Sequence, residues 1–229
     1  MLRWLLAIAT ALLATDSLAQ ISGSASAVSD YRFRGVSLSN GQPAAQADVS
    51  YDHDSGWYEG LFASNVRFDY ELKREAQVVG FAGYARRVQN GLSVDTGATY
   101  STFSGGDGYN YAELHAGFTS THFSGRIYYA PNYFGRDFRT LYAELNASQR
   151  LTDRLRLIGH AGVLKPVSTP DDRAAQERAR VDLQAAVELL VKSFTLQVGR
   201  IANDGASRVY PVRESHTGGI WTVRLSVSF

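Results

Sequence analysis

The chain ends on Gly219–Phe229, which reads G-I-W-T-V-R-L-S-V-S-F. Side chains alternate across an extended strand with a period of two, so each face of this strand has its own composition. One face carries only apolar residues, namely Trp221, Val223, Leu225, Val227 and Phe229. The other face carries threonine, arginine and serine. An apolar outer face, a polar inner face and a terminal aromatic residue are typical of the closing strand of a transmembrane β-barrel.

The same alternation recurs along the chain and predicts twelve strands of roughly eight to eleven residues, the length that crosses a bilayer at a tilt. The expected strands are Ile21–Phe33, Ala44–His53, Trp57–Val66, Gln77–Val88, Leu92–Phe103, Tyr111–Ser120, Phe123–Ala130, Leu141–Leu151, Leu155–Leu164, Val181–Val191, Phe194–Ile201 and Gly219–Phe229. The predicted fold is therefore all-β.

The connections between these strands alternate strictly in length. Short turns are expected near Asp54, Gln89, Thr121, Thr152 and Lys192, and a longer loop follows every odd-numbered strand. Bacterial outer-membrane barrels combine an even strand number with short periplasmic turns and longer extracellular loops. We therefore expect a transmembrane antiparallel up-and-down β-barrel in that orientation.

One segment fits the strand pattern less well. Residues Asp171 to Val191 begin with D-D-R-A-A-Q-E-R-A-R, which is rich in strong helix formers. A helix in place of the strand at Val181 would leave an odd strand number and put Phe229 on the wrong side of the membrane. We expect a strand from Val181, and Asp171–Arg178 can be helical within the preceding loop.

The first nineteen residues have the composition of a secretory signal peptide. A short basic start, Met1-Leu2-Arg3, precedes an apolar core and the small residues Ser17-Leu18-Ala19. We expect cleavage before Gln20, a barrel domain of residues 20–229, and location in the cell outer membrane. No later segment has eighteen consecutive apolar residues, so no transmembrane helix is expected.

Composition excludes several classes of protein. The 229 residues contain no cysteine, so neither disulfides nor thiolate metal sites can form. The formal net charge of +1 gives no support for nucleic-acid binding. Mean hydropathy is slightly negative, at −0.19, as expected where only alternate strand residues face lipid.

Aromatic residues are expected in two belts at the lipid–water interfaces. The outer belt would hold Tyr31, Phe33, Phe62, Tyr100, Tyr129 and Trp221. The inner belt would hold Tyr51, Tyr58, Phe118, Phe123, Phe194 and Phe229.

Several motifs resemble a known family. They are S-D-Y-R-F-R-G at Ser29–Gly35, G-W-Y-E-G at Gly56–Gly60, Y-A-E-L-H-A-G at Tyr111–Gly117 and Y-Y-A-P-N-Y-F-G at Tyr128–Gly135. With Gly41–Ala44 and the closing strand, they make most of the mature chain similar to the TorF family of porins, proteobacterial outer-membrane proteins of poorly defined function. The resemblance implies a porin-like outer-membrane barrel and supplies no catalytic residue and no substrate.

The polar strand faces are expected to line the barrel lumen and carry charges of both signs. The expected lumen-lining residues are Asp30, Arg32, Arg34, Asp48, Glu59, Asp95, Glu113, His115, Arg126, Glu144, Arg156, His160 and Arg224, with Asp182 and Glu188 on the same face. Such a lining can select small polar, charged or zwitterionic solutes in a channel. It can equally form paired charges that fill and stiffen a plugged barrel. The sequence leaves both interpretations open.

An enzyme is the alternative of a different class. An outer-membrane lipid hydrolase needs a serine nucleophile, a histidine base and an orienting group near the lipid-facing surface. None of the five histidines is expected beside an outward serine, so we predict no enzyme and no catalytic residue. His115 and His160 could bind a metal with Glu113, but lone lumen histidines are more often hydrogen-bonded, and we expect no metal and no cofactor.

The expected partners follow from the barrel. They are outer-membrane lipid, lipopolysaccharide, the barrel-assembly machinery acting on the Phe229 strand, and small polar solutes. A surface protein acting through its longest loops, Lys165–Ala179 and Asn203–Thr217, is a further alternative.

Overall fold

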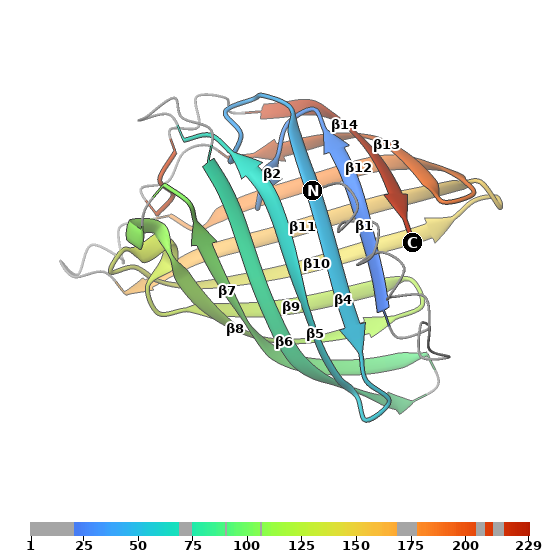
Figure 1. Ribbon diagram of the computed structural model, residues 1–229, viewed down its shortest axis with the longest axis horizontal. Coiled ribbons are helices and arrows are strands. Elements are labelled where there is room, and N and C mark those ends of the chain that lie inside the picture. Colours follow the sequence, from blue (N-terminus) through green and yellow to red (C-terminus); the bar gives the residue numbers. More distant parts are fainter. Residues whose placement is uncertain are drawn as a thin grey trace, which may run out of the picture.

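The computed structural model describes residues 21–68, 75–89, 91–105, 107–168, 178–204, 209–212 and 218–229. Twelve of its strands form one closed antiparallel barrel, in which each strand pairs with its neighbours along the chain (Figure 1). They are β1 Ile21–Val28, β4 Ala44–Asp52, β5 Trp57–Val66, β6 Glu75–Gln89, β7 Leu92–Phe103, β8 Tyr111–Ser120, β9 Phe123–Ala130, β10 Arg139–Arg150, β11 Leu155–Ser168, β12 Arg180–Val191, β13 Phe194–Asn203 and β14 Gly218–Ser228. The predicted fold class is confirmed.

The remaining elements lie outside the barrel ladder. β2 Arg32–Phe33 and β3 Val36–Ser37 form a small separate sheet, and two short 3₁₀ turns are η2 Asp107–Tyr109 and η3 Tyr133–Gly135. No helix in the described part of the chain is long and apolar enough to cross a membrane. The expected signal peptide lies outside the described residues, as does nearly all of the expected helix at Asp171–Arg178.

The barrel closes between its first and last strands. β1 pairs with β14 from Ser24↔Ser228 to Val28↔Arg224, and Gly23 and Phe229 exchange two backbone hydrogen bonds of 3.0 Å. The Phe229 ring crosses Gly23 so closely that a Cβ at that position would lie 2.7 Å from it. Because both edges of the sheet are paired with each other, the barrel has no strand edge whose backbone N–H and C=O groups need water.

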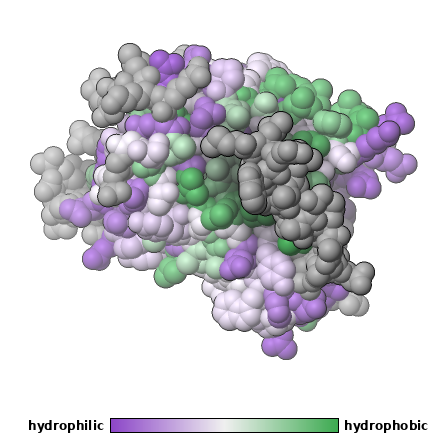
Figure 2. Space-filling model, in the orientation of Figure 1, coloured by the Kyte–Doolittle hydropathy of each residue, from purple (hydrophilic) through white to green (hydrophobic). Residues whose placement is uncertain are grey.

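The outer surface is mainly apolar. On β14 the side chains of Trp221 and Phe229 are 67% and 77% exposed, and Val223 and Leu225 lie on the same face, as expected. Leu, Val, Ile and Phe side chains on most of the other barrel strands are similarly exposed. Figure 2 shows hydrophobic residues along the visible strand wall and most of the hydrophilic ones towards its margins.

The two ends of the barrel differ, and we name them the short-turn end and the long-loop end. The buried apolar residues gather at the long-loop end, where β1 ends at Val28, β5 at Val66 and β7 at Phe103, and where β8 begins at Tyr111. This end lies to the left in Figure 1, beside the 3₁₀ turns. The barrel is therefore filled at one end by a packed apolar layer.

The expected first strand is too long by five residues. The strand ends at Val28, and residues 29–43 turn into the barrel instead of continuing along its wall. We call residues 29–43 the lumen hairpin. Tyr31 and Phe33, expected at the outer lipid interface, therefore lie inside, because the interior offers their rings other aromatic rings to pack against.

The expected faces of β5 are reversed. Trp57 and Leu61 are exposed on the outer surface, at 61% and 54%, whereas Tyr58 and Phe62 point inward to Asp95 and Tyr31. Glu59 lies on the same face as Trp57 and Leu61 and pairs with Tyr51, so its expected place in the lumen is wrong.

Candidate functional site

The lumen hairpin turns back on itself at Arg34-Gly35. These two residues have φ values of +51° and +77° and connect β2 to β3, the geometry of a two-residue type I′ turn. At its base, the Asp30 carboxylate accepts hydrogen bonds from Ser37 Oγ at 2.5 Å, Ser39 Oγ at 3.0 Å and Arg32 Nη1 at 2.8 Å. One buried carboxylate thus holds both arms of the hairpin together.

Arg34 fixes the hairpin to the barrel wall opposite β1 and β4. Its Nη1 and Nη2 atoms donate to the two oxygens of Glu113 on β8, at 2.8 and 3.0 Å, and Nη1 also donates to Tyr133 Oη at 3.1 Å. Its guanidinium lies 4.1 Å from the ring centroid of Tyr142 on β10 and 4.9 Å from that of Tyr128 on β9. A bidentate, charge-assisted pair between aromatic rings is a strong anchor.

Arg34 adopts a positive φ that favours glycine, at a cost of about 1 kcal/mol. That cost persists only because the surrounding contacts fix the residue. Burial alone would lower the pKa of the guanidinium, but the charge and hydrogen bond of Glu113, together with Tyr133 and Tyr111, more than offset this and the pKa is raised. Arg34 therefore stays charged at any physiological pH.

Gly35 fixes the hairpin tip to a second part of the wall. Its carbonyl accepts from Asn203 Nδ2 at 2.7 Å, and a Cβ at Gly35 would lie 2.7 Å from Cβ of Asp182 and 3.1 Å from Cβ of Asn203. The tip thus contacts β12 and β13 as well as β8–β10. Only glycine fits this close approach.

An apolar layer covers the hairpin at the long-loop end. Val36 and Leu38 of the hairpin are fully buried, as are Tyr133 and Phe134 of η3 and Val209. Burial raises the pKa of the Tyr31 and Tyr133 phenols, so both stay neutral at neutral pH. Packing and hydrogen bonds together close this end of the barrel.

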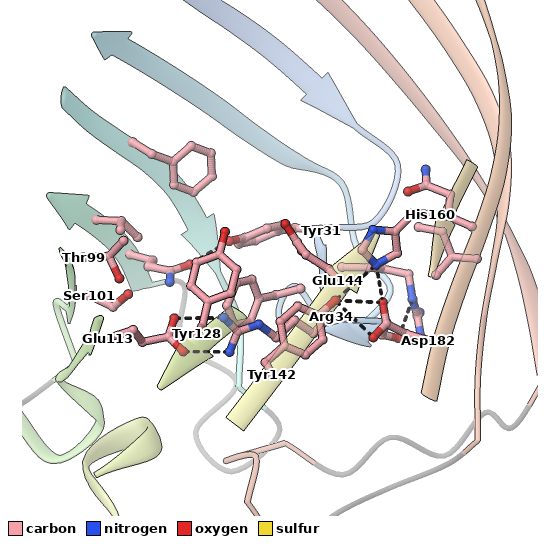
Figure 3. Close-up of a pocket in the computed structure, with 18 residues that line it drawn as sticks. Tyr31, Arg34, Thr99, Ser101, Glu113, Tyr128, Tyr142, Glu144, His160 and Asp182 are labelled. Carbon is pink, nitrogen blue, oxygen red and sulfur yellow. Dashed lines mark hydrogen bonds and ion pairs between the residues drawn. The ribbon is translucent and has the colours of Figure 1, made fainter. Parts of the chain in front are cut away.

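Two cavities remain beside the hairpin. The larger has a volume of about 380 Å³ and lies between the hairpin and the inner wall formed by β5–β13 (Figure 3). The smaller, of about 160 Å³, lies towards β13 and β14 and includes Arg224. Both contain Arg32, Gln184 and Ile201, so the two cavities adjoin.

The other inward charges of the strands are mostly paired along the wall. Asp95 lies 3.2 Å from Arg126 and 3.3 Å from His115, Arg156 lies 2.6 Å from Glu188, and His160 lies 2.8 Å from Asp182. The structure places twelve of the thirteen expected residues inside the barrel, namely Asp30, Arg32, Arg34, Asp48, Asp95, Glu113, His115, Arg126, Glu144, Arg156, His160 and Arg224. Any role for them in solute passage stays a prediction.

Sequence reasoning missed the aromatic part of the site. Tyr31, Tyr128, Tyr133 and Tyr142 surround Arg34 or the larger cavity, and the expectation that rings face lipid excluded Tyr31 from the interior. The signal that could have revealed the hairpin is the pair of close turn dipeptides, Arg34-Gly35 and Asn40-Gly41. All four residues have positive φ, which a straight strand does not allow.

Neither a metal site nor a catalytic triad is evident among the described residues. No group of three or more His, Asp or Glu residues there could hold a metal ion. His115 contacts Tyr58 and Asp95, whereas His160 contacts Asn146, Asp182 and Tyr142 on a different part of the wall.

Comparison with known proteins gives a family and a fold. The sequence model of the Gcw_chp family, described as a bacterial protein of unknown function, matches residues 13–229. No curated protein matches the chain in sequence. The description of the family does not include the TorF name, which stays an expectation.

Solved structures with a similar fold are outer-membrane proteins. A KdgM porin is 14% identical, with 92% of this chain and 98% of that chain covered and a TM-score of 0.51. A NanC porin is 12% identical over 91% and 98% of the two chains, with a TM-score of 0.52. Omp33 of Acinetobacter baumannii is 9% identical over 92% and 97%, also with a TM-score of 0.52. At such identities the likeness establishes the barrel fold alone.

Proposed function

Because the chain belongs to the Gcw_chp family, whose function is unknown, we propose its role from the barrel itself: an outer-membrane porin for small polar solutes, held nearly closed by the lumen hairpin. The observation that carries this proposal is a closed barrel with an apolar outside and an interior that holds cavities lined with polar groups. The similar fold of porins supports it.

Lipid is the solvent that suits the outer surface. Exposed side chains such as Leu114, Ile127 and Trp221, each more than half exposed, would be costly in water over so large an area. A barrel satisfies all its backbone hydrogen bonds internally, which is what hydrocarbon demands. We therefore propose the outer membrane as its location, with the long-loop end outside the cell.

The hairpin favours a channel with a removable constriction. Side chains provide most of its contacts with the far wall, above all Arg34 with Glu113 and Asn203 with the Gly35 carbonyl. The barrel ladder does not include β2 or β3, so the hairpin can leave the lumen without breaking a strand pair. The two adjoining cavities beside the hairpin mark the path that its withdrawal would widen.

A permanently plugged structural barrel is the second candidate, and the buried apolar layer around Val36 and Leu38 favours it. We do not propose a lipid hydrolase. Among the described residues the one hydrogen bond between a serine hydroxyl and a histidine ring, Ser55 Oγ to His53 Nδ1 at 2.6 Å, is exposed at a turn, and no carboxylate there pairs with that histidine.

Planar-bilayer recordings test the proposal. We expect small, discrete conductance steps from the purified protein, and larger steps after residues 31–41 are replaced by a short Gly-Ser linker. Folding of both proteins is checked by their heat-dependent mobility on gels. A folded hairpin-deleted barrel without conductance would falsify the channel proposal and favour a structural barrel.

The proposed partners follow from the same placement. Lipid and lipopolysaccharide would cover the outer surface, and the barrel-assembly machinery would recognise the closing strand that ends at Phe229.

A further inference from the structure

Glu144 differs from the other charges of the larger cavity because it has no cationic partner. It lies on β10, half-buried, and its Oε1 accepts one long hydrogen bond, 3.4 Å from Asn146 Nδ2. No Arg, Lys or His of the described chain lies within ion-pair distance of it. A half-buried carboxylate with so little compensation favours a bound cation.

The other charged groups of this cavity already balance one another. Arg34 is paired with Glu113 at 2.8 Å, and Arg32 with Asp30 at 2.8 Å. His160 Nε2 donates to Asp182 Oδ1 at 2.8 Å, and the other ring nitrogen, Nδ1, lies 2.6 Å from the side-chain amide oxygen Oδ1 of Asn146. Acceptors at both nitrogens favour the imidazolium form, which neutralises Asp182. The cavity therefore carries one net negative charge, located at Glu144.

The arginines of the cavity are not available to a bound anion. Arg34 directs both terminal nitrogens at Glu113, and its guanidinium plane is covered by rings. Arg32 donates from Nε and Nη2 to the Gly35 carbonyl and from Nη1 to Asp30. An anionic solute would have to break these bonds, whereas a cation would meet the Glu144 carboxylate, which has no cationic partner among the described residues.

The volume and the lining of the larger cavity indicate what kind of cation would fit it. A volume of about 380 Å³ falls in the range of small-molecule sites. Phe33, Phe62 and Val79 give part of the wall an apolar surface, while Thr99 and Ser101 add hydroxyl groups (Figure 3). Such a space suits a compact molecule with one positive charge and an apolar body.

We propose that the larger cavity binds a small organic cation, a protonated amine with an apolar body, with Glu144 as its counter-ion. This inference rests on the proposed function, in which it makes the porin selective for amines over carboxylates. In the docked state the amine lies beneath the hairpin, and in the open state Glu144 attracts it into the lumen.

Calorimetry on the detergent-purified full-length protein tests binding without any need for transport. The probes are phenethylammonium, its neutral analogue phenethyl alcohol and the anion 3-phenylpropanoate. We expect phenethylammonium to bind tightest. In Glu144→Gln its affinity should fall about tenfold, which is what one hydrogen bond to a charged group contributes.

Glu59→Gln is the matched control. Glu59 lies on the outer face of β5 and does not line the cavity. The substitution removes the same charge there, so binding should equal that of the wild type. Glu144→Asp keeps the charge and should retain most of the affinity. Equal binding by wild type and Glu144→Gln, or tighter binding of 3-phenylpropanoate, overturns the proposal.

Reversal potentials across a phenethylammonium gradient separate the two proposals. A protein that conducts but neither binds nor prefers the amine rejects the cation site and keeps the channel. A protein that binds the amine through Glu144 without conducting supports the site and rejects the channel.

Discussion

Replacing Arg34 by alanine removes the contact that joins the lumen hairpin to the far wall. The substitution deletes both bonds to Glu113, the bond to Tyr133 and the ring contacts with Tyr128 and Tyr142. The positive φ remains, because alanine has the same Cβ. The change therefore tests the anchor rather than the turn.

The size of the effect follows from the Glu113 carboxylate that remains. Its side chain is 5% exposed, and removing one partner of a buried ion pair costs about 3–5 kcal/mol. That cost falls on the docked hairpin, because a withdrawn hairpin leaves Glu113 facing the water-filled lumen. The ratio of withdrawn to docked hairpin should therefore rise about 150- to 5,000-fold.

Two measurements report on this ratio. Hydrogen exchange should speed up at Leu38, whose amide bonds to the Tyr31 carbonyl at 2.8 Å inside the hairpin. Single-channel conductance should rise towards that of the hairpin-deleted barrel. Arg126→Ala is the control, because Arg126 also faces inward and pairs with Asp95 yet does not contact the hairpin.

Unchanged exchange and conductance in Arg34→Ala would refute the reasoning, since the hairpin would then be held by its apolar layer alone. If Arg126→Ala changed hydrogen exchange and conductance as much as Arg34→Ala, the cause would be the loss of a positive charge in the lumen and not the loss of the hairpin anchor.

Other substitutions and conditions give separate expectations. Gly35→Ala should release the hairpin and raise conductance. Gly41→Ala is the control: Gly41 has a similar positive φ but nothing within 4 Å of an added Cβ, so the change should cost only about 1 kcal/mol of local stability and leave conductance unchanged. Burial raises the pKa of Tyr31, so docking of the hairpin should not vary with pH below about 10. Above that pH the phenol of a withdrawn hairpin ionises while the docked one does not, so docking should weaken. Conductance should therefore be higher above about pH 10 than below it. Arg224→Gln should shift reversal potentials towards cations if the channel conducts, because the Arg224 guanidinium donates to Gln46 and has no carboxylate within ion-pair distance in the described chain. Phe229→Ala should lower the yield of folded barrel on heat-modifiability gels, with a wild-type yield counting against a role for the ring in closure.

Alternation predicted the wall of the barrel because a closed barrel with an apolar outside and a polar inside imposes it on nearly every strand. On β14, β8 and β12 the apolar and polar faces are clean, and the structure confirms them. On β5 the alternation pattern gave the wrong faces because apolar residues occupy both. Trp57 and Leu61 face outward, whereas Tyr58 and Phe62 face inward and pack against other aromatic rings. The sequence prediction therefore placed Glu59 in the lumen, whereas it lies on the outer face.

The hairpin was missed for a related reason. D-Y-R-F-R-G-V-S alternates as a strand does, and the pattern cannot distinguish rings packed in lipid from rings packed in a lumen. What decides between them is a set of distant partners, Glu113, Tyr133 and Asn203, which lie 79, 99 and 168 residues from their contacts in the hairpin. A local pattern carries no information about such contacts.

Those long sequence separations also impose an order of assembly. The anchor for Arg34 exists only when β8 and η3 already stand in their final places, and the anchor for Gly35 needs β12 and β13 as well. Those elements must therefore be in place before the tip of residues 29–43 can dock, although residues 29–43 leave the ribosome before any of them. An early segment of the chain is thus fixed only by late partners, so docking of the hairpin is coupled to completion of the barrel.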